Sequence, residues 1–109
     1  MNEMNKTSWK LWLDDQINDL ETPVRWAPEG SIGAGSTEEA KKLVVKNGPP
    51  GFMDLDHDLG GDDTAMIFLN WLFSSYGCEY PPDYNVHSEN PIGRDNIVSF
   101  MKSWKKSIG

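Results

Sequence analysis

The sequence predicts an α/β domain built around a short parallel sheet of about four strands. Strand-like and helix-like patterns alternate along the chain, and segments long enough for a crossover helix separate the strong strands. The chain has 109 residues, which suffices for one compact domain and is too short for two. We therefore expect residues 1–109 to form a single domain.

The first third of the chain contains one strong strand and several weaker elements. Residues 8–13 read as a strand of mixed exposure that ends at a pair of aspartates. Residues 16–22 favour a short helical turn, and residues 24–26 are a weak strand candidate. Residues 27–35 contain three glycines and a proline, so we expect a loop there.

A helix and the central strand follow. Ser36 and Glu39 have the spacing of a capping box, which predicts a helix that runs to about Lys46 and stops at Gly48. Residues 51–56 form the second strong strand, directly after a pair of prolines.

The last part of the chain contains two helices and a third strong strand. Residues 63 or 64 to 76 predict a helix that is apolar on nearly every face and is therefore buried against a sheet or a partner. Residues 84–87 form the strand, residues 91–94 a turn, and residues 95–106 the final helix. The apolar face of that helix contains Ile97, Val98, Phe100, Met101 and Trp104.

Composition excludes several classes of partner and site. The net charge is −7, so the chain lacks the basic surface that binds duplex DNA or an anionic membrane. Cys78 is the single cysteine, which excludes an internal disulfide and a zinc site built from thiolates. There is no apolar stretch of membrane-spanning length and no signal-peptide pattern, so we expect a cytoplasmic protein.

Polar side chains follow each of the three strong strands. In a parallel sheet the carboxyl ends of the strands meet at one edge, and ligands bind there at the point where the strand order switches. We therefore expect these side chains to converge. They are Asp14 and Asp15 after the first strand, Asp56, His57 and Asp58 after the second, and His87, Ser88 and Asn90 after the third.

Residues 54–63 contain five aspartates and no lysine or arginine. Uncompensated carboxylates close together cost free energy, and a bound cation would explain why they are gathered here. Carboxylate ligands select hard cations, which predicts Mg²⁺ or Mn²⁺. The candidate ligands are Asp14, Asp56 and Asp58, with Asp15 as a further candidate.

The other members of this run have different expected roles. Asp54 should point to the opposite face of the strand or to a neighbour. Gly60 and Gly61 should form a turn, and Asp62 and Asp63 should cap the helix that follows.

Both histidines of the chain, His57 and His87, lie at strand ends. An imidazole near carboxylates suits general acid–base catalysis around neutral pH, so both are candidate catalytic residues. Asp56 is a third candidate, as an alternative covalent acceptor of phosphate.

Residues 87–96 form a turn before a helix N-terminus, where backbone N–H groups bind anions. Ser88, Asn90 and Arg94 are the candidate phosphate-binding residues, and Arg94 offers a bidentate donor. Taken alone, the segment is better explained as an ordinary turn in which Asp95 or Asn96 caps the helix, and only its position opposite the acidic cluster makes it a candidate phosphate site.

Residues 12–15, 55–60 and 87–96 read WLDD, LDHDLG and HSENPIGRDN. These segments resemble the cyclic-phosphate processing receiver family, which has a WLDD-type first strand, a DHDLG central motif and an HSxNPxGRxN turn. The resemblance extends over residues 9–104 and implies a compact, three-layer, receiver-like or flavodoxin-like domain. It also implies the processing of cyclic phosphate ends or nucleotides, a role assigned to that family from genomic context.

Two departures distinguish the chain from the receivers of response regulators. It has no fifth strand with the switch lysine that contacts a phosphoaspartate, and an Asp-His-Asp sequence replaces the plain acceptor aspartate. Both count against two-component signalling, and Arg94 is a candidate for the missing positive charge.

The leading hypothesis is a metal-dependent phosphoesterase that acts on a cyclic phosphate of a nucleotide or an RNA end. In this hypothesis the aspartates hold the metal, His57 is the general base or acid, and His87 protonates the leaving oxygen. The alternative is a non-catalytic module that binds a nucleotide or phosphate signal, or a protein partner, at the same edge. Receiver-like phosphotransfer to Asp56 ranks third.

Overall fold

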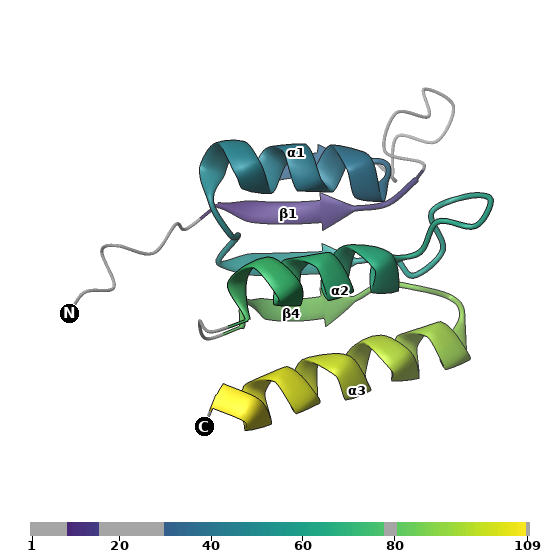
Figure 1. Ribbon diagram of the computed structural model, residues 1–109. Coiled ribbons are helices and arrows are strands. Elements are labelled where there is room, and N and C mark those ends of the chain that lie inside the picture. Colours follow the sequence, from purple (N-terminus) through teal and green to yellow (C-terminus); the bar gives the residue numbers. More distant parts are fainter. Residues whose placement is uncertain (1–8, 16–29, 78–80, 109) are drawn as a thin grey trace.

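The computed structural model describes residues 9–15, 30–77 and 81–108 (Figure 1). The predicted turn over residues 16–22 and the weak strand over residues 24–26 lie outside these residues, as does Cys78. The elements in chain order are β1 (Lys10–Leu13), β2 (Ser31–Ala34), α1 (Thr37–Asn47), β3 (Phe52–Leu55), α2 (Ala65–Tyr76), β4 (Asp83–Val86) and α3 (Pro91–Ile108).

The four strands form one sheet in the order β2-β1-β3-β4, and every neighbouring pair is parallel. The α/β class and the four-stranded parallel sheet are therefore confirmed. The chain goes outward from β1 to β2 and then returns to β3, so the strand order switches between β1 and β3. That position is where open α/β sheets bind their ligands.

The three described helices lie in a row on one side of the sheet, in the order α1, α2, α3 (Figure 1). The described residues thus supply two of the three expected layers, namely the sheet and one layer of helices. None of the described helices is long and apolar enough to cross a membrane.

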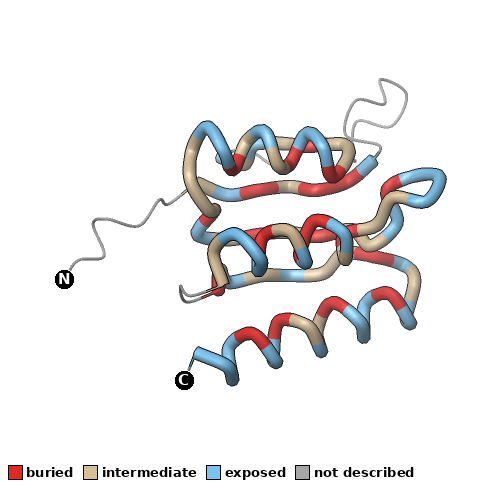
Figure 2. Tube along the Cα trace, viewed as in Figure 1, coloured by how far each residue is buried: buried red, intermediate tan, exposed pale blue. Residues whose placement is uncertain are grey.

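The core lies between the sheet and these helices (Figure 2). Alternate strand residues point to opposite faces, so Leu11, Leu13, Met53 and Leu55 face the helices and are fully buried. Burying each such side chain stabilises the fold by about 1.5–3 kcal/mol. The helices contribute Ala40, Val44, Ala65, Phe68, Leu69, Leu72, Ile97, Met101 and Trp104 to the same core.

Helix α1 begins and ends as its sequence predicts. The Oγ atom of Ser36 accepts a hydrogen bond from the backbone N–H of Glu39 at 3.2 Å, which is half of the expected capping box. The Glu39 carboxylate accepts from the N–H of Gly35 at 2.6 Å instead of from Ser36 itself. Gly48 ends the helix with φ 84°, a conformation that favours glycine, and its N–H donates to Val44 at 2.7 Å.

Two boundaries differ from the predictions. Residues 27–35 were expected to be a loop, but Ser31–Ala34 form the edge strand β2, because pairing with β1 provides backbone partners that outweigh the weak strand propensity of glycine. Helix α3 begins at Pro91 instead of Asp95. The Oδ1 atom of Asn90 accepts from the N–H of Gly93 at 3.0 Å, so Asn90 is the N-cap and Pro91 occupies the first helical position, which proline favours.

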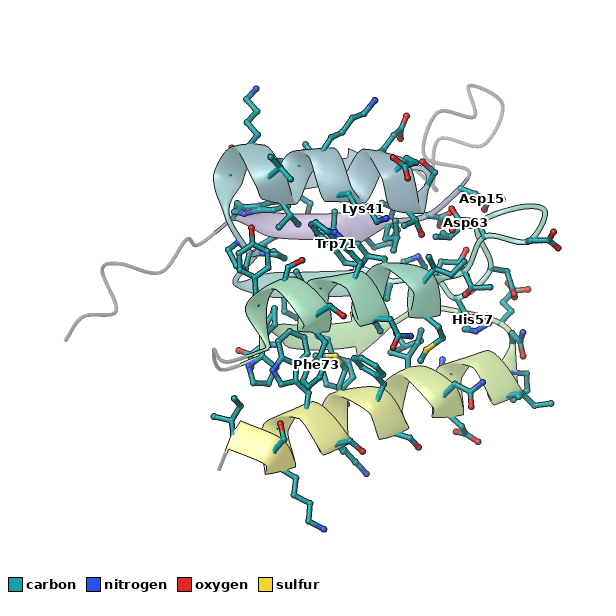
Figure 3. The ribbon with its side chains drawn as sticks, in the orientation of Figure 1. Asp15, Lys41, His57, Asp63, Trp71 and Phe73 are labelled. Atoms are coloured by element: carbon teal, nitrogen blue, oxygen red, sulfur yellow. The ribbon has the colours of Figure 1, made fainter. Side chains whose placement is uncertain are left out.

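Helix α2 is only partly buried, although its sequence is apolar on nearly every face. Phe68, Leu69 and Leu72 are fully buried, whereas Ile67 remains 46% exposed and Phe73 38% exposed. Phe73 lies between α2 and α3 (Figure 3). Its ring packs edge-on against Trp104 of α3, with centroids 5.4 Å apart. The face of α2 that contains Phe73 therefore packs against α3.

Candidate metal and phosphate site

A cleft of about 560 Å³ opens at the carboxyl ends of the strands. Backbone hydrogen bonds continue the sheet one residue beyond β1, β3 and β4: Asp14 donates to Ala34, Asp56 to Leu13 and His87 to Leu55, at 2.9–3.0 Å. The first residue after each of these strands is thus fixed at the same edge. The cleft is lined by Asp15, Asp56, Asp58, Gly60, Gly61, His87, Ser88, Glu89 and Asn90.

Asp14, Asp56 and His87 could together hold a metal ion. Each offers one ligand atom, and the three atoms lie within 4.8 Å of one another. Two carboxylates and an imidazole form a ligand set that divalent cations accept. Asp14 is fully buried, whereas Asp56 and His87 are partly exposed to the cleft.

The electrostatics of Asp56 fit a cation at this place. Burial raises the pKa of the Asp56 carboxyl, and the nearby Asp14 carboxylate raises this pKa further. His87 acts in the opposite direction, as does a hydrogen bond from the backbone of Asp58. The ionised form of Asp56 is therefore undercompensated by the protein alone, and a divalent cation would supply the missing positive charge.

His87 is held on three sides. Its Nδ1 atom lies 2.6 Å from Oδ1 of Asp54, and its Nε2 atom lies 3.2 Å from Oδ2 of Asp14. The ring stacks on Trp12 with centroids 4.2 Å apart and an interplanar angle of 3°. Asp54 points away from the helices, as expected, because it alternates with the buried Met53 and Leu55.

His57 and Asp58 form a second pair beside the cleft. The Nδ1 atom of His57 lies 3.0 Å from Oδ1 of Asp58, and Asn90 donates to Oδ2 of Asp58 at 3.2 Å. These hydrogen bonds, first that of His57 and then that of Asn90, lower the pKa of Asp58. Asp58 lines the cleft, whereas the His57 ring is mostly buried behind it and packs against Gly93.

Ser88 and Asn90 line the cleft, but Arg94 does not. The buried Ser88 accepts from the N–H of Asn90 at 3.1 Å through its Oγ atom. Arg94 folds back toward the turn, where its guanidinium donates to the Ser88 carbonyl at 3.4 Å. The expected capping by Asp95 or Asn96 is wrong, because Asn90 caps α3, five residues before the predicted start of the helix.

Asp63 also has a different role from the expected one. Its carboxylate accepts from the N–H of Thr37 at 2.8 Å and from the Thr37 hydroxyl at 2.6 Å, so it caps α1 and not the helix that follows it. The N-cap of α2 is Thr64, whose side chain makes no capping hydrogen bond. Gly60 and Gly61 adopt φ values of 94° and 56°, which agrees with the predicted turn.

Three residues near the site were not predicted to belong to it. Glu89 lines the cleft, Asp54 contacts His87, and Trp12 stacks on His87. The alternation of residues in the first strand places Trp12 opposite the buried Leu11 and Leu13, and this signal could have assigned it to the outer face. The contact with His87 additionally requires the order of the strands.

Comparison of the sequence with known protein families agrees with this architecture. The sequence model of the cyclic-phosphate processing receiver domain matches residues 9–103. No match to the chain was found among curated proteins or among solved structures. The matched region contains all seven described helices and strands apart from the end of α3, and it contains all the described residues that line the cleft. The chain therefore belongs to the cyclic-phosphate processing receiver domain family.

Proposed function

We propose that the chain is a metal-dependent phosphoesterase that opens a cyclic phosphate of a nucleotide or an RNA end. The observation that carries this proposal is the convergence of Asp14, Asp56 and His87, whose ligand atoms lie within 4.8 Å of one another beside an open cleft. Membership of the family supports a cyclic phosphate as the substrate.

Asp14 and Asp56 would hold Mg²⁺ or Mn²⁺, and Asp15 lines the cleft nearby as a further ligand. A bound divalent ion supplies charge compensation for the phosphoryl oxygens and makes a water more acidic. Asp58 is less suited to the metal than the sequence suggested, because both of its oxygens already accept hydrogen bonds.

The reaction adds water across one phosphate ester bond. The water oxygen bonds to phosphorus, the ester oxygen leaves and gains a proton, and a phosphate monoester remains. His57 would accept the proton of the attacking water, and the Asp58 carboxylate, 3.0 Å from Nδ1 of His57, would stabilise the protonated ring. The proton for the leaving oxygen would come from His87 in the sequence-based hypothesis, but its Nε2 atom cannot serve as donor and metal ligand at once.

Ser88 is the best-supported phosphate-binding residue. Its Oγ atom already accepts from Asn90, which leaves its hydroxyl hydrogen to donate toward the cleft. Asn90 uses its side-chain oxygen to cap α3 and its amide group to bind Asp58, so its role is to shape the wall of the cleft. Arg94 would bind a phosphate only after turning away from the Ser88 carbonyl.

A hydrolysis assay tests the proposal. The purified chain is incubated with 2′,3′- and 3′,5′-cyclic nucleotides and with an RNA carrying a 2′,3′-cyclic end, with Mn²⁺, Mg²⁺ or a chelator. We expect metal-dependent opening by the unaltered chain, loss of the activity in Asp56→Asn, and full activity in Asp62→Asn, which changes an exposed aspartate outside the cleft. The absence of metal-stimulated hydrolysis for all substrates would contradict the proposal.

A non-catalytic phosphate-binding module is the second candidate. The contacts of the two histidines favour it, because His57 and His87 both bind protein carboxylates. It predicts capture of a cyclic nucleotide without turnover, and His57→Ala would then weaken binding instead of slowing a reaction. Receiver-like phosphotransfer to Asp56 has less support, because no lysine is among the described residues that line the cleft.

A further inference from the structure

We propose that His87 is the nitrogen ligand of the metal, that Asp54 is the residue that positions it, and that the site consequently prefers Mn²⁺ to Mg²⁺. This inference rests on the proposed metal site. The metal would then be held by carboxylates and one imidazole instead of by carboxylates alone. Asp54, which is not among the residues that line the cleft, would orient the imidazole.

The His87 ring is held in one orientation by its neighbours. Trp12 lies parallel to the ring at 4.2 Å and restricts rotation out of the plane. Asp54 lies 2.6 Å from Nδ1 and restricts rotation within the plane. Asp54 is itself fixed, since Asn85 on the neighbouring strand donates to the same oxygen at 3.3 Å. Trp12, Asp54 and Asn85 occupy one row across β1, β3 and β4.

This placement selects one tautomer of the imidazole. A carboxylate accepts hydrogen bonds and donates none, so Asp54 requires a hydrogen on Nδ1 of His87. In the neutral ring the lone pair then lies on Nε2, which is the atom that points to Asp14 and the proposed metal site. Histidines that bind metals commonly donate their second ring N–H to a carboxylate in this way, which orients the ring and makes it more basic.

The competing explanation is a structural ion pair. In that case His87 carries hydrogens on both ring nitrogens and bridges Asp54 and Asp14, and no metal touches the ring. The two explanations differ in one measurable respect, which is whether a bound metal ion is coupled to a ring nitrogen.

The choice of metal follows from the nitrogen ligand. Mg²⁺ prefers oxygen ligands and gives up its bound water reluctantly. Mn²⁺ accepts carboxylates as Mg²⁺ does, but it belongs to the first transition row, whose divalent ions also bind nitrogen ligands. Two carboxylates and one imidazole therefore favour Mn²⁺ over Mg²⁺. The positioning role of Asp54 should be visible chiefly in the affinity for the ion that uses the nitrogen.

Electron paramagnetic resonance of bound Mn²⁺ tests this inference, and the measurement does not depend on hydrolytic activity. In the unaltered full chain, bound Mn²⁺ should show hyperfine coupling to ¹⁴N by electron spin-echo modulation, and this measurement needs no variant. His87→Gln should remove the coupling. Asp54→Asn should weaken Mn²⁺ binding by about 10–100-fold, the range found for partners of metal-binding histidines, and should weaken Mg²⁺ binding less.

Asp83→Asn is the matched control. Asp83 is an exposed aspartate on the same face of the sheet, paired in register with Phe52 and two residues before Asn85, so its replacement removes the same charge away from His87. We expect it to leave Mn²⁺ binding unchanged. Circular dichroism of each variant verifies that the protein is folded under the binding conditions.

Bound Mn²⁺ without ¹⁴N coupling would overturn the assignment of His87, and equal effects of Asp54→Asn and Asp83→Asn would overturn that of Asp54. Equal affinity for Mn²⁺ and Mg²⁺ would overturn the proposed preference of the site for Mn²⁺. These outcomes are distinct from a failure of the proposed function, because ¹⁴N-coupled Mn²⁺ in a protein that hydrolyses no cyclic phosphate would support the ligand assignment and contradict only the hydrolase.

Discussion

The Oδ2 atom of Asp14 lies 3.2 Å from Nε2 of His87, although β1 and β4 are not neighbours in the sheet. The contact crosses the end of β3, which carries Asp56, and it joins residues 73 positions apart in the sequence. Asp14, Asp56 and His87 are thus brought together by the strand order β2-β1-β3-β4. The site exists because the order switches between β1 and β3.

Replacing Asp56 by asparagine should stabilise the metal-free protein at neutral pH. Burial and the Asp14 carboxylate raise the pKa of Asp56, so the folded state binds this proton more tightly than the unfolded state. The free energy of unfolding therefore falls as the pH rises from the ordinary aspartate pKa through the raised one, and it stays reduced above that range. Asp56→Asn should be more stable than the unaltered chain at pH 7, and this difference should shrink at acidic pH.

Urea unfolding at several pH values in the presence of a chelator measures this effect. Asp62→Asn, which alters an exposed aspartate, should show no such pH-dependent gain. If Asp56→Asn were less stable than the unaltered chain at pH 7, the conclusion that the Asp56 carboxylate is undercompensated would be wrong.

Mn²⁺ should stabilise the unaltered chain. A ligand that binds the folded state alone adds about 2.7 kcal/mol to the free energy of unfolding at 100 times its dissociation constant. The gain should disappear in Asp56→Asn and persist in Asp62→Asn. Thermal unfolding with and without the ion measures it, and an equal gain in both variants would point to binding elsewhere.

Replacing Gly93 by alanine should destabilise the protein. An alanine Cβ at this position would lie 2.4 Å from Cγ of His57, closer than real contacts allow. In an open helical position the same change stabilises by about 0.5–1 kcal/mol, whereas here the clash should reverse the sign and cost about 1–3 kcal/mol.

Urea unfolding of Gly93→Ala reports this cost, with Ser103→Ala at an exposed position of the same helix as the control. The control should stay within about 0.5 kcal/mol of the unaltered chain. A stabilised Gly93→Ala protein would show that His57 does not pack closely on α3.

Asp63→Ala should cost about 1 kcal/mol, because Asp63 caps the N-terminus of α1 through two hydrogen bonds to Thr37. The neighbouring Asp62 is exposed, so Asp62→Ala should change stability by less than about 0.5 kcal/mol. Equal effects of the two substitutions in urea unfolding would contradict the capping role of Asp63.

Elements with strong local signals could be predicted from the sequence. Ser36 and Gly48 mark the ends of α1 through capping geometry, which depends on a few adjacent residues. Strand β2 has no comparable signal, because its stability comes from pairing with β1 and not from its own Ser-Ile-Gly-Ala sequence. The start of α3 was misplaced for a different reason, since an asparagine followed by proline is typical of both a turn and an N-cap.

The residues of the site that directly follow a strand could be predicted from the sequence. Asp14, Asp56 and His87 each follow a strong strand, and the rule that parallel strands present their carboxyl ends at one edge brings them together. The contact of Asp54 with His87 depends on the register of two strands, and the contact of Asp63 with Thr37 joins residues 26 positions apart. Contacts of this kind follow from the tertiary arrangement, which no local pattern encodes.

Phosphorus nuclear magnetic resonance of a 2′,3′-cyclic nucleotide incubated with the Mn²⁺-loaded chain shows directly whether the protein opens a cyclic phosphate. We expect the cyclic phosphate resonance to be replaced by that of a phosphate monoester and a chelator to prevent this change. Asp56→Asn should not produce the monoester, whereas Asp62→Asn should. The 3′,5′-cyclic nucleotide and an RNA with a cyclic end are followed in the same way. A folded, metal-loaded protein that leaves the resonances of all three substrates unchanged would contradict the proposed phosphoesterase activity.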